Sequence, residues 1–79
     1  MEKFTVNLSE ISDVEEFVRI TANCKFDVTL SQGQYDVSGK SLMGIFSLDI
    51  TKPVDVLVEC PDDAVRTDFV NKIEKYIIA

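Results

Sequence analysis

The chain has 79 residues, 46% of them hydrophobic, and a formal net charge of −6 at pH 7. A chain of this length forms one small domain with a stability margin of about 3–5 kcal/mol, so most apolar residues are needed in its core. An acidic surface without a basic cluster repels nucleic acids and anionic membranes, so we expect a single domain over residues 1–79 with neither as a partner.

The N-terminal segment predicts a strand and a helix. Apolar and polar residues alternate from Lys3 to Leu8, which indicates a strand with one buried face. Ser12 and Glu15 then have the spacing of a capping box. Apolar residues at helical intervals follow, and they predict a helix from about Asp13 to Cys24.

The middle of the chain predicts a hairpin and a short helix. A second alternation runs from Phe26 to Leu30, and Gln32-Gly33-Gln34 offers a turn. A short returning strand is expected from Tyr35 to Val37. The apolar run from Ser41 to Leu48 indicates a short, mostly buried helix whose cap is Ser41.

The C-terminal third predicts one more strand and one more helix. Pro53 opens a strand whose inward-facing residues are Val54, Val56, Val58 and Cys60. Pro61 suits a first helical position, and Asp62 and Asp63 would place negative charge in the first turn. The apolar stripe of this helix consists of Val65, Phe69, Ile73, Tyr76 and Ile77.

The predicted order of elements is therefore β-α-β-β-α-β-α. Three of the four strands alternate clearly, so one face of the sheet should be exposed and the other covered by helices. This pattern is typical of a two-layer α+β sandwich with a mainly antiparallel sheet.

The two cysteines, Cys24 and Cys60, lie far apart, and no charged-then-apolar leader precedes the first predicted strand. Small secreted domains normally carry more disulfides, so we expect a cytoplasmic protein with reduced thiols. Two cysteines without histidine do not make a zinc site, and no cofactor is expected. Cys60 precedes a helix, a position that favours a reactive thiol, but a small buried hydrophobe is the simpler interpretation.

The motif Gly39-Lys40-Ser41 looks like the end of a phosphate-binding P-loop. A Walker A motif needs another glycine five residues before Gly39, and Gln34 occupies that position. The chain is also too short for the doubly wound domain that presents such a loop. We therefore interpret the motif as a glycine-bearing turn followed by a capping serine.

The stretch "VSGKSLMGIFSL", residues 37–48, resembles the "VNGKSIMGLLSL" segment of HPr, the phosphocarrier of the bacterial sugar phosphotransferase system. The stretch "EFVRITANCKFDVTL", residues 16–30, is similar to the first helix and second strand of that family. The resemblance implies the HPr-like open-faced sandwich, with a four-stranded, mainly antiparallel sheet covered on one face by three helices.

The resemblance also implies where a phosphoryl group would be carried, and there the chain departs from the family. HPr uses a histidine in a "G-x-H-A-R-P" loop, which falls on "LSEISD", residues 8–13, when counted without gaps from Phe17. Glu10 then stands at the histidine position, Ser12 at the arginine position and Asp13 at the proline position, and the chain contains no histidine at all. We expect no histidine phosphotransfer and no catalytic residue.

Two other roles for Glu10 are open. A neutral imidazole accepts a phosphoryl group near neutral pH, whereas a carboxylate would have to form a reactive acyl phosphate. Glu10 is therefore a weak candidate for a relocated acceptor. Its negative charge would alternatively imitate the phosphorylated state towards a partner, and a solvated loop glutamate is the simplest interpretation.

The resemblance assigns further roles around the predicted short helix. Ser41 aligns with the serine that many HPr proteins use as a regulatory phosphorylation site, although a helix cap alone explains a serine there. Leu42, Met43 and Phe46 align with the apolar patch that HPr presents to its partners, and their spacing can place them on one helix face. The alternative is that they only pack this helix onto the sheet.

We therefore expect a non-enzymatic HPr-like protein that acts through protein contacts and is switched at Ser41. Its partners would be enzymes of the phosphotransferase system, HPr kinase or a transcriptional regulator. The alternatives are a phosphocarrier with a relocated acceptor and an interaction domain that keeps only the fold.

Overall fold

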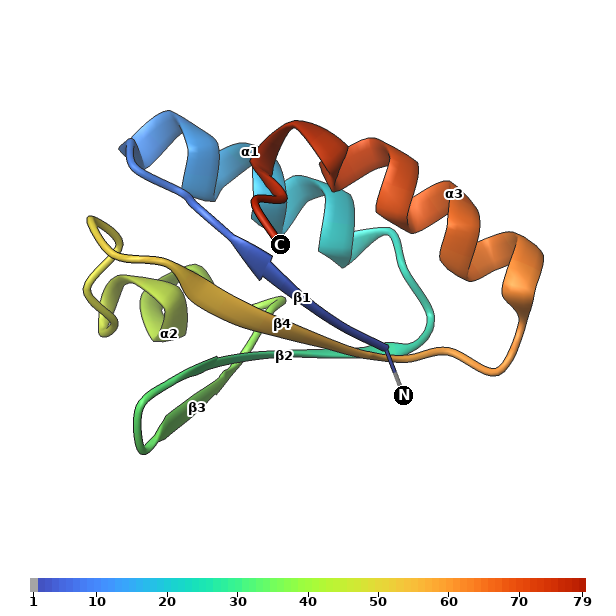
Figure 1. Cartoon of the computed structure of the whole chain (residues 1–79), viewed down its shortest axis with the longest axis horizontal. Coiled ribbons are helices and arrows are strands. Elements are labelled where there is room, and N and C mark those ends of the chain that lie inside the picture. The colour runs from blue at the N-terminus through green and yellow to red at the C-terminus, as the bar shows by residue number, and fades with distance from the viewer. Residues whose placement is uncertain (1) are drawn as a thin grey trace.

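The computed structural model describes residues 2–79, and the element order in this range is the predicted β-α-β-β-α-β-α. A short 3₁₀ helix follows the last α-helix. Figure 1 shows α1 and α3 side by side over one face of the sheet, with α2 at its margin beside β3. The elements are β1 (Glu2–Val6), α1 (Ile11–Ala22), β2 (Asp27–Gln32), β3 (Tyr35–Ser38), α2 (Leu42–Phe46), β4 (Val54–Glu59), α3 (Asp63–Ile73) and η1 (Glu74–Tyr76).

The sheet has the strand order β1-β4-β2-β3, and every neighbouring pair is antiparallel. The hairpin of β2 and β3 turns at Gly33, which has a φ of 61°. Beyond β1, the chain end continues the hydrogen bonding, because Thr5 N donates to Ala79 O (2.9 Å) and Ile78 N donates to Thr5 O (2.8 Å). The α+β sandwich and the mainly antiparallel sheet are thus confirmed.

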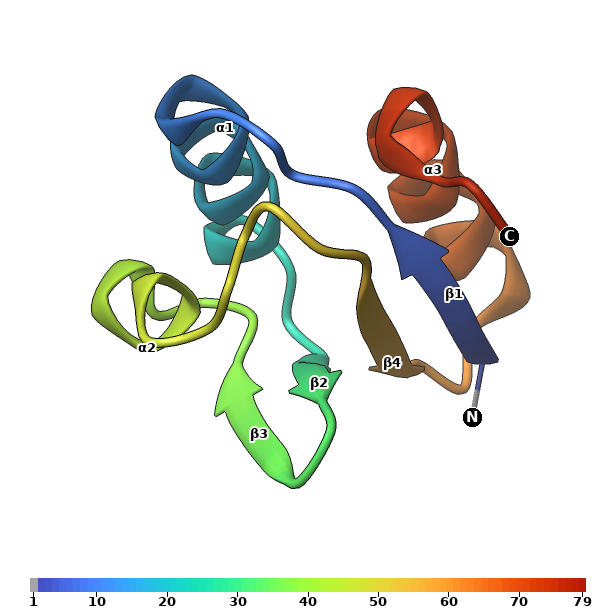
Figure 2. The same cartoon turned by 60° about the vertical axis from the view of Figure 1, so that its left-hand side comes forward.

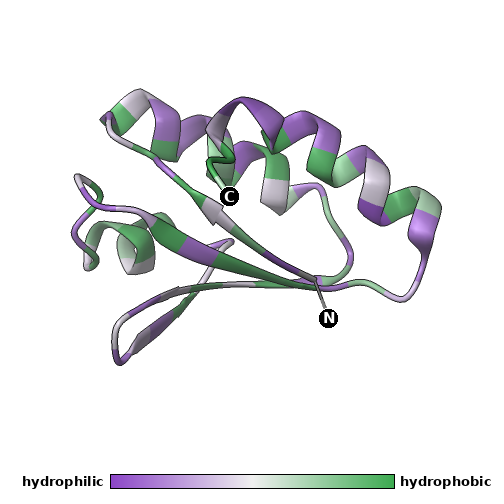
Figure 3. Cartoon of the chain, in the orientation of Figure 1, coloured by the Kyte–Doolittle hydropathy of each residue, from purple (hydrophilic) through white to green (hydrophobic). Residues whose placement is uncertain are grey.

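The core lies between the sheet and the helices. Hydrophobic and hydrophilic residues alternate along the strands (Figure 3), as two faces of different polarity require. The inward-facing Val54, Val56 and Val58 of β4 are at most 1% exposed, and Cys60 is also buried. From α1 and α3, the buried apolar residues are Val14, Phe17, Phe69 and Ile73. Within residues 2–79, none of the helices is both long and apolar enough to cross a membrane.

The start of α1 differs from the prediction. The helix begins at Ile11 with Glu10 as its cap, so Ser12 lies in the first turn and is not the cap. Asp13 Oδ2 accepts a hydrogen bond from Glu10 N (3.3 Å), which gives this pair the role expected of Ser12 and Glu15. The spacing of three residues is the same in both pairs, so it could not decide between them.

The end of α1 also differs from the prediction, because the helix ends at Ala22 and not at Cys24. Asn23 is the residue that closes it. Its backbone N–H donates to Ile20 O (3.3 Å), and its Nδ2 donates to Arg19 O (3.1 Å). These bonds satisfy carbonyl groups of the last turn, which would otherwise lack partners.

The start of α3 also lies later than expected. Asp62 is its cap, accepting at Oδ1 from Ala64 N (2.9 Å) and Val65 N (3.1 Å), so Pro61 precedes the helix. Val65 was predicted to be buried, but it is 47% exposed. Figure 1 shows the reason, since the first turn of α3 extends past the ends of β1 and β2 and has no sheet beneath it.

A polar contact ties α1 to the C-terminal part of the chain. Tyr76 OH donates to Glu16 Oε1 (2.5 Å), and Lys75 Nζ forms an ion pair with the same carboxylate. The lysine, and then the tyrosine hydroxyl, hold the pKa of Glu16 below its usual value. Burial, together with the bond to Glu16, raises the pKa of Tyr76.

Candidate functional site

Gly39 occupies a position where only glycine fits without a shift. Its N–H donates to Val28 O (2.7 Å), and a Cβ at this residue would lie 2.7 Å from Val28 Cγ1 and 2.9 Å from Leu30 Cδ1. Thr21 Oγ1, buried in α1, donates to Gly39 O (2.7 Å). Gly39 therefore joins the C-terminal half of α1 to β2.

Lys40 and Ser41 also have structural partners. Lys40 Nζ donates to Cys24 O (2.9 Å) just after α1. Ser41 caps α2 as predicted, because its Oγ accepts from Gly44 N (3.0 Å) and its carbonyl accepts from Ile45 N (3.0 Å). Packing and capping explain the Gly-Lys-Ser motif, while phosphorylation of Ser41 stays a prediction.

The α2 helix is attached by one side and exposed on the other. Ile45 is fully buried, and Leu48, just after the helix, is 7% exposed. On the other side, Met43 is 81% exposed, Phe46 39% and Leu42 38%. We call Leu42, Met43 and Phe46 the α2 surface. Since Met43 is so exposed, packing onto the sheet does not explain it, and it explains the other two only in part.

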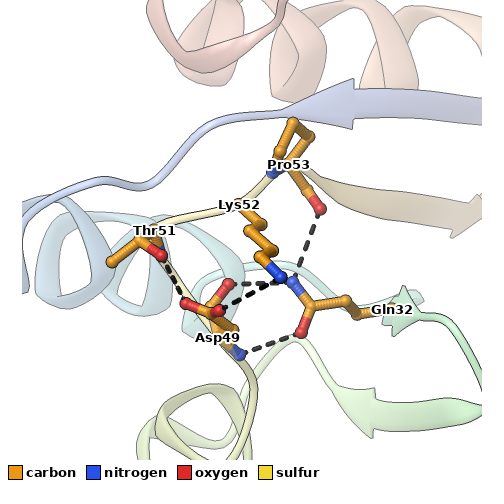
Figure 4. A network of polar contacts seen from close by, with 5 residues as sticks. All are labelled: Gln32, Asp49, Thr51, Lys52 and Pro53. Carbon is orange, nitrogen blue, oxygen red and sulfur yellow. Dashed lines mark hydrogen bonds and ion pairs between the residues drawn. The ribbon is translucent and has the colours of Figure 1, made fainter.

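A side-chain amide fixes the loop that follows α2. Gln32 Nε2 donates to Asp49 O (2.8 Å), and Gln32 Oε1 accepts from Asp49 N (2.9 Å), as Figure 4 shows. Asp49 Oδ1 in turn accepts from Thr51 Oγ1 (2.5 Å) and Thr51 N (3.1 Å). These bonds lower the pKa of Asp49. The end of β2 thereby holds the loop that follows α2.

The start of α1 lies at the same end of the molecule as α2 (Figure 1), and the two helices are in contact. Glu10 and Ser12 are exposed, and Asp13 is half-buried. Ile11 is 64% exposed, which the sequence reasoning missed. Because Ile11 precedes the buried Val14 by three residues, its spacing alone suggests a buried position.

Residues 13–78 match the family model described as "PTS HPr component phosphorylation site". This chain belongs to the HPr family of the phosphotransferase system. HPr proteins are phosphocarriers and not enzymes, so the expected family and the non-enzymatic class are both confirmed.

A solved structure with a similar fold is the crystal structure of HPr-C-His from Thermoanaerobacter tengcongensis. The TM-score is 0.75 at 20% sequence identity, over 95% of this chain and 93% of that chain. At this identity the likeness supports the fold alone. No curated protein sequence matches the chain.

The family match begins at Asp13 and so does not include Glu10 or Ser12. The placement of Glu10 at the histidine position and of Ser12 at the arginine position therefore stays a prediction.

Proposed function

We propose that this HPr-family protein acts by binding other proteins through the α2 surface and does not relay phosphate through histidine. The observation that carries the proposal is the absence of histidine from all 79 residues. A phosphohistidine cannot form on a chain without an imidazole.

The start of α1 supports the same conclusion by its charge. In our sequence comparison Glu10 stands at the family position for the phosphoryl acceptor, and Asp13 follows within the first turn of α1. Asp13 Oδ2 accepts from the backbone N–H of Glu10 (3.3 Å), which holds the Asp13 carboxylate beside Glu10. Two carboxylates repel an incoming phosphate, and Ser12 supplies no guanidinium to offset them.

The α2 surface supports binding by protein contacts. It combines a largely exposed methionine with two half-exposed apolar side chains on a helix that the buried Ile45 attaches to the core. Methionine adapts its shape to a partner, and exposed apolar groups gain free energy when a partner covers them.

Phosphorylation at Ser41 would act on this surface directly. A phosphate adds about −1.5 to −2 charge next to Leu42 and Met43, and it can still accept the hydrogen bond from Gly44 N. We propose enzymes of the phosphotransferase system, HPr kinase or a transcriptional regulator as the cytoplasmic partners.

Incubation with enzyme I and phosphoenolpyruvate, followed by intact mass spectrometry, tests the loss of phosphotransfer. We expect an unchanged mass while an HPr with its histidine gains one phosphoryl group in the same reaction. A stable phosphoryl group that Glu10→Gln removes would overturn the proposal and favour the relocated acceptor.

Incubation with HPr kinase and ATP tests the switch. We expect one phosphate that is lost in Ser41→Ala and retained in Ser47→Ala, which changes a second serine at the other end of α2. Absence of modification in the native protein would contradict the switch and favour an interaction domain that keeps only the fold.

A further inference from the structure

A cavity of about 510 Å³ opens between the end of α1, the start of β2 and the first turns of α3. These elements meet at the opposite end of the longest axis from α2 (Figure 1), so the cavity is separate from the α2 surface. Its volume lies within the range of small-molecule sites, roughly 300–1,000 Å³.

The wall of the cavity is mainly apolar and partly aromatic. Phe26 and Phe69 meet edge to face, with ring centroids 5.3 Å apart and an interplanar angle of 83°. Ile20 lines the cavity as well, and so does Val65, the apolar side chain left 47% exposed in the first turn of α3. A ligand in this space would cover apolar surface that the fold leaves in contact with water.

Cys24 and Cys60 also line the cavity, and each thiol donates a hydrogen bond to a backbone carbonyl. Cys24 Sγ donates to Ile20 O (3.5 Å), and Cys60 Sγ donates to Asp62 O (3.4 Å). Burial raises the pKa of the Cys24 thiol. A buried cysteine behaves as a small hydrophobe, and no histidine or carboxylate joins the two sulfur atoms in a metal-binding group among the described residues. With Phe26 and Phe69 in the same wall, the lining suits an aromatic ligand better than a metal ion.

Two lysines and two aspartates form the charged part of the rim. Lys72 Nζ pairs with Asp68 Oδ2 (3.1 Å), and Asp62 Oδ1 accepts from two backbone N–H groups of α3. Lys25 is exposed, directly precedes Phe26, and makes no hydrogen bond or ion pair within residues 2–79. The two charges of each sign balance, but Asp68 is paired with Lys72 and Asp62 is hydrogen-bonded to the start of α3, so Lys25 is the rim cation left without an ion pair in the described part of the chain.

We propose that this cavity binds a small aromatic carboxylate, with its ring beside Phe26 and Phe69 and its carboxylate paired with Lys25. This site is independent of the proposed protein contacts at α2. A ligand of this size binds with a dissociation constant on the order of 1 mM.

The test uses 4-phenylbutyrate as the probe and 4-phenylbutanamide as its uncharged analogue. Each is titrated into the ¹⁵N-labelled protein while amide shifts are followed by NMR. We expect saturable shifts confined to the cavity-lining segments 20–26 and 60–72, and about threefold weaker binding of the amide, the size of one exposed ion pair. In Lys25→Gln, acid and amide should bind equally.

A matched pair of variants tests the location. Val65→Glu places a carboxylate in the cavity, whereas Ala64→Glu adds the same charge at the neighbouring exposed position, which does not line it. We expect Val65→Glu to abolish the shifts and Ala64→Glu to retain them, with both variants folded as judged by the remaining amide signals.

Four results would overturn the proposal: no saturable shift up to about ten times the expected constant, equal binding of acid and amide to the native protein, shifts centred on α2, or equal effects of the two glutamate variants.

Discussion

Substitution of Gly39 by alanine tests whether packing holds the Gly-Lys-Ser motif in place. The added Cβ would lie 2.7 Å from Val28 Cγ1 and 2.9 Å from Leu30 Cδ1, closer than the 3.0 Å below which something must shift. Either these buried side chains or residue 39 would have to shift, and a movement of residue 39 away from β2 would also lengthen the 2.7 Å bond from Thr21 Oγ1 to its carbonyl.

The expected loss of stability combines two effects. Overpacking of a core costs about 1–3 kcal/mol, and loss of a buried hydrogen bond costs about 1 kcal/mol. We expect Gly39→Ala to lower the free energy of unfolding by about 2–4 kcal/mol, which is most of the roughly 3–5 kcal/mol expected for a chain of this size. Urea unfolding followed by circular dichroism measures the change, and the melting temperature should fall by roughly 10–25 °C.

Two further substitutions, Gly33→Ala and Val28→Ala, separate the cost of packing at Gly39 from the cost of changing a glycine backbone. Gly33→Ala places a Cβ in open space at a φ of 61°, so its cost of about 1–2 kcal/mol comes from the backbone alone. Val28→Ala removes the nearest clashing atom, so Gly39→Ala should cost at least about 0.5 kcal/mol less in that background. An equal cost in both backgrounds, or a cost below about 0.5 kcal/mol in the native protein, would refute the packing argument.

Three further predictions concern single side chains. Ser41→Ala removes the cap of α2 and should lower the free energy of unfolding by about 1 kcal/mol in urea, while an unchanged value would contradict the capping role. Met43→Glu should change the free energy of unfolding by less than about 0.5 kcal/mol, because Met43 is 81% exposed, yet it should abolish partner binding in pull-down assays. The control is Ile78→Glu, at a residue that is 58% exposed and lies outside α2, and it should retain binding. Equal effects of the two variants on binding would argue against the α2 surface. Glu16→Gln removes the carboxylate that pairs with Lys75 and accepts from Tyr76. Because these two partners lower the pKa of Glu16 from 4.5, the carboxylate stabilises the fold above pH 4.5, and this stabilisation is lost as the pH falls through the folded pKa. The urea midpoints of native protein and variant should differ at pH 7 and converge as the pH is lowered below the folded pKa of Glu16, and a pH-independent difference would contradict the ion pair.

The sheet and the order of elements were predictable because strand periodicity is a property of neighbouring residues. The alternation of Val54, Val56 and Val58 could only bury one face, and these residues are at most 1% exposed. Helix ends were less predictable, since several residues near each end can serve as the cap. Ser12 and Asp62 show this, because the first proved to lie inside a helix and the second, assigned to a first turn, proved to be the cap.

The candidate site was predictable only in part. A serine before an apolar run indicated the cap at Ser41, but an almost continuous apolar run cannot show which of its residues is buried. Tertiary packing places Ile45 against the core and leaves Met43 exposed. The exposure of Val65 likewise depends on how far α3 extends past the sheet, which no local pattern records.

The structural roles of Gly39, Lys40 and Ser41 bear on how function should be inferred for this chain. All three make contacts that stabilise the fold, so their presence requires neither a nucleotide nor a phosphorylation site. The α2 surface is different, because the buried Ile45 and Leu48 already attach the helix without help from Met43. An exposed methionine between two half-exposed apolar side chains adds nothing that the fold needs, so binding of a partner, and not phosphate chemistry, is the property to measure first.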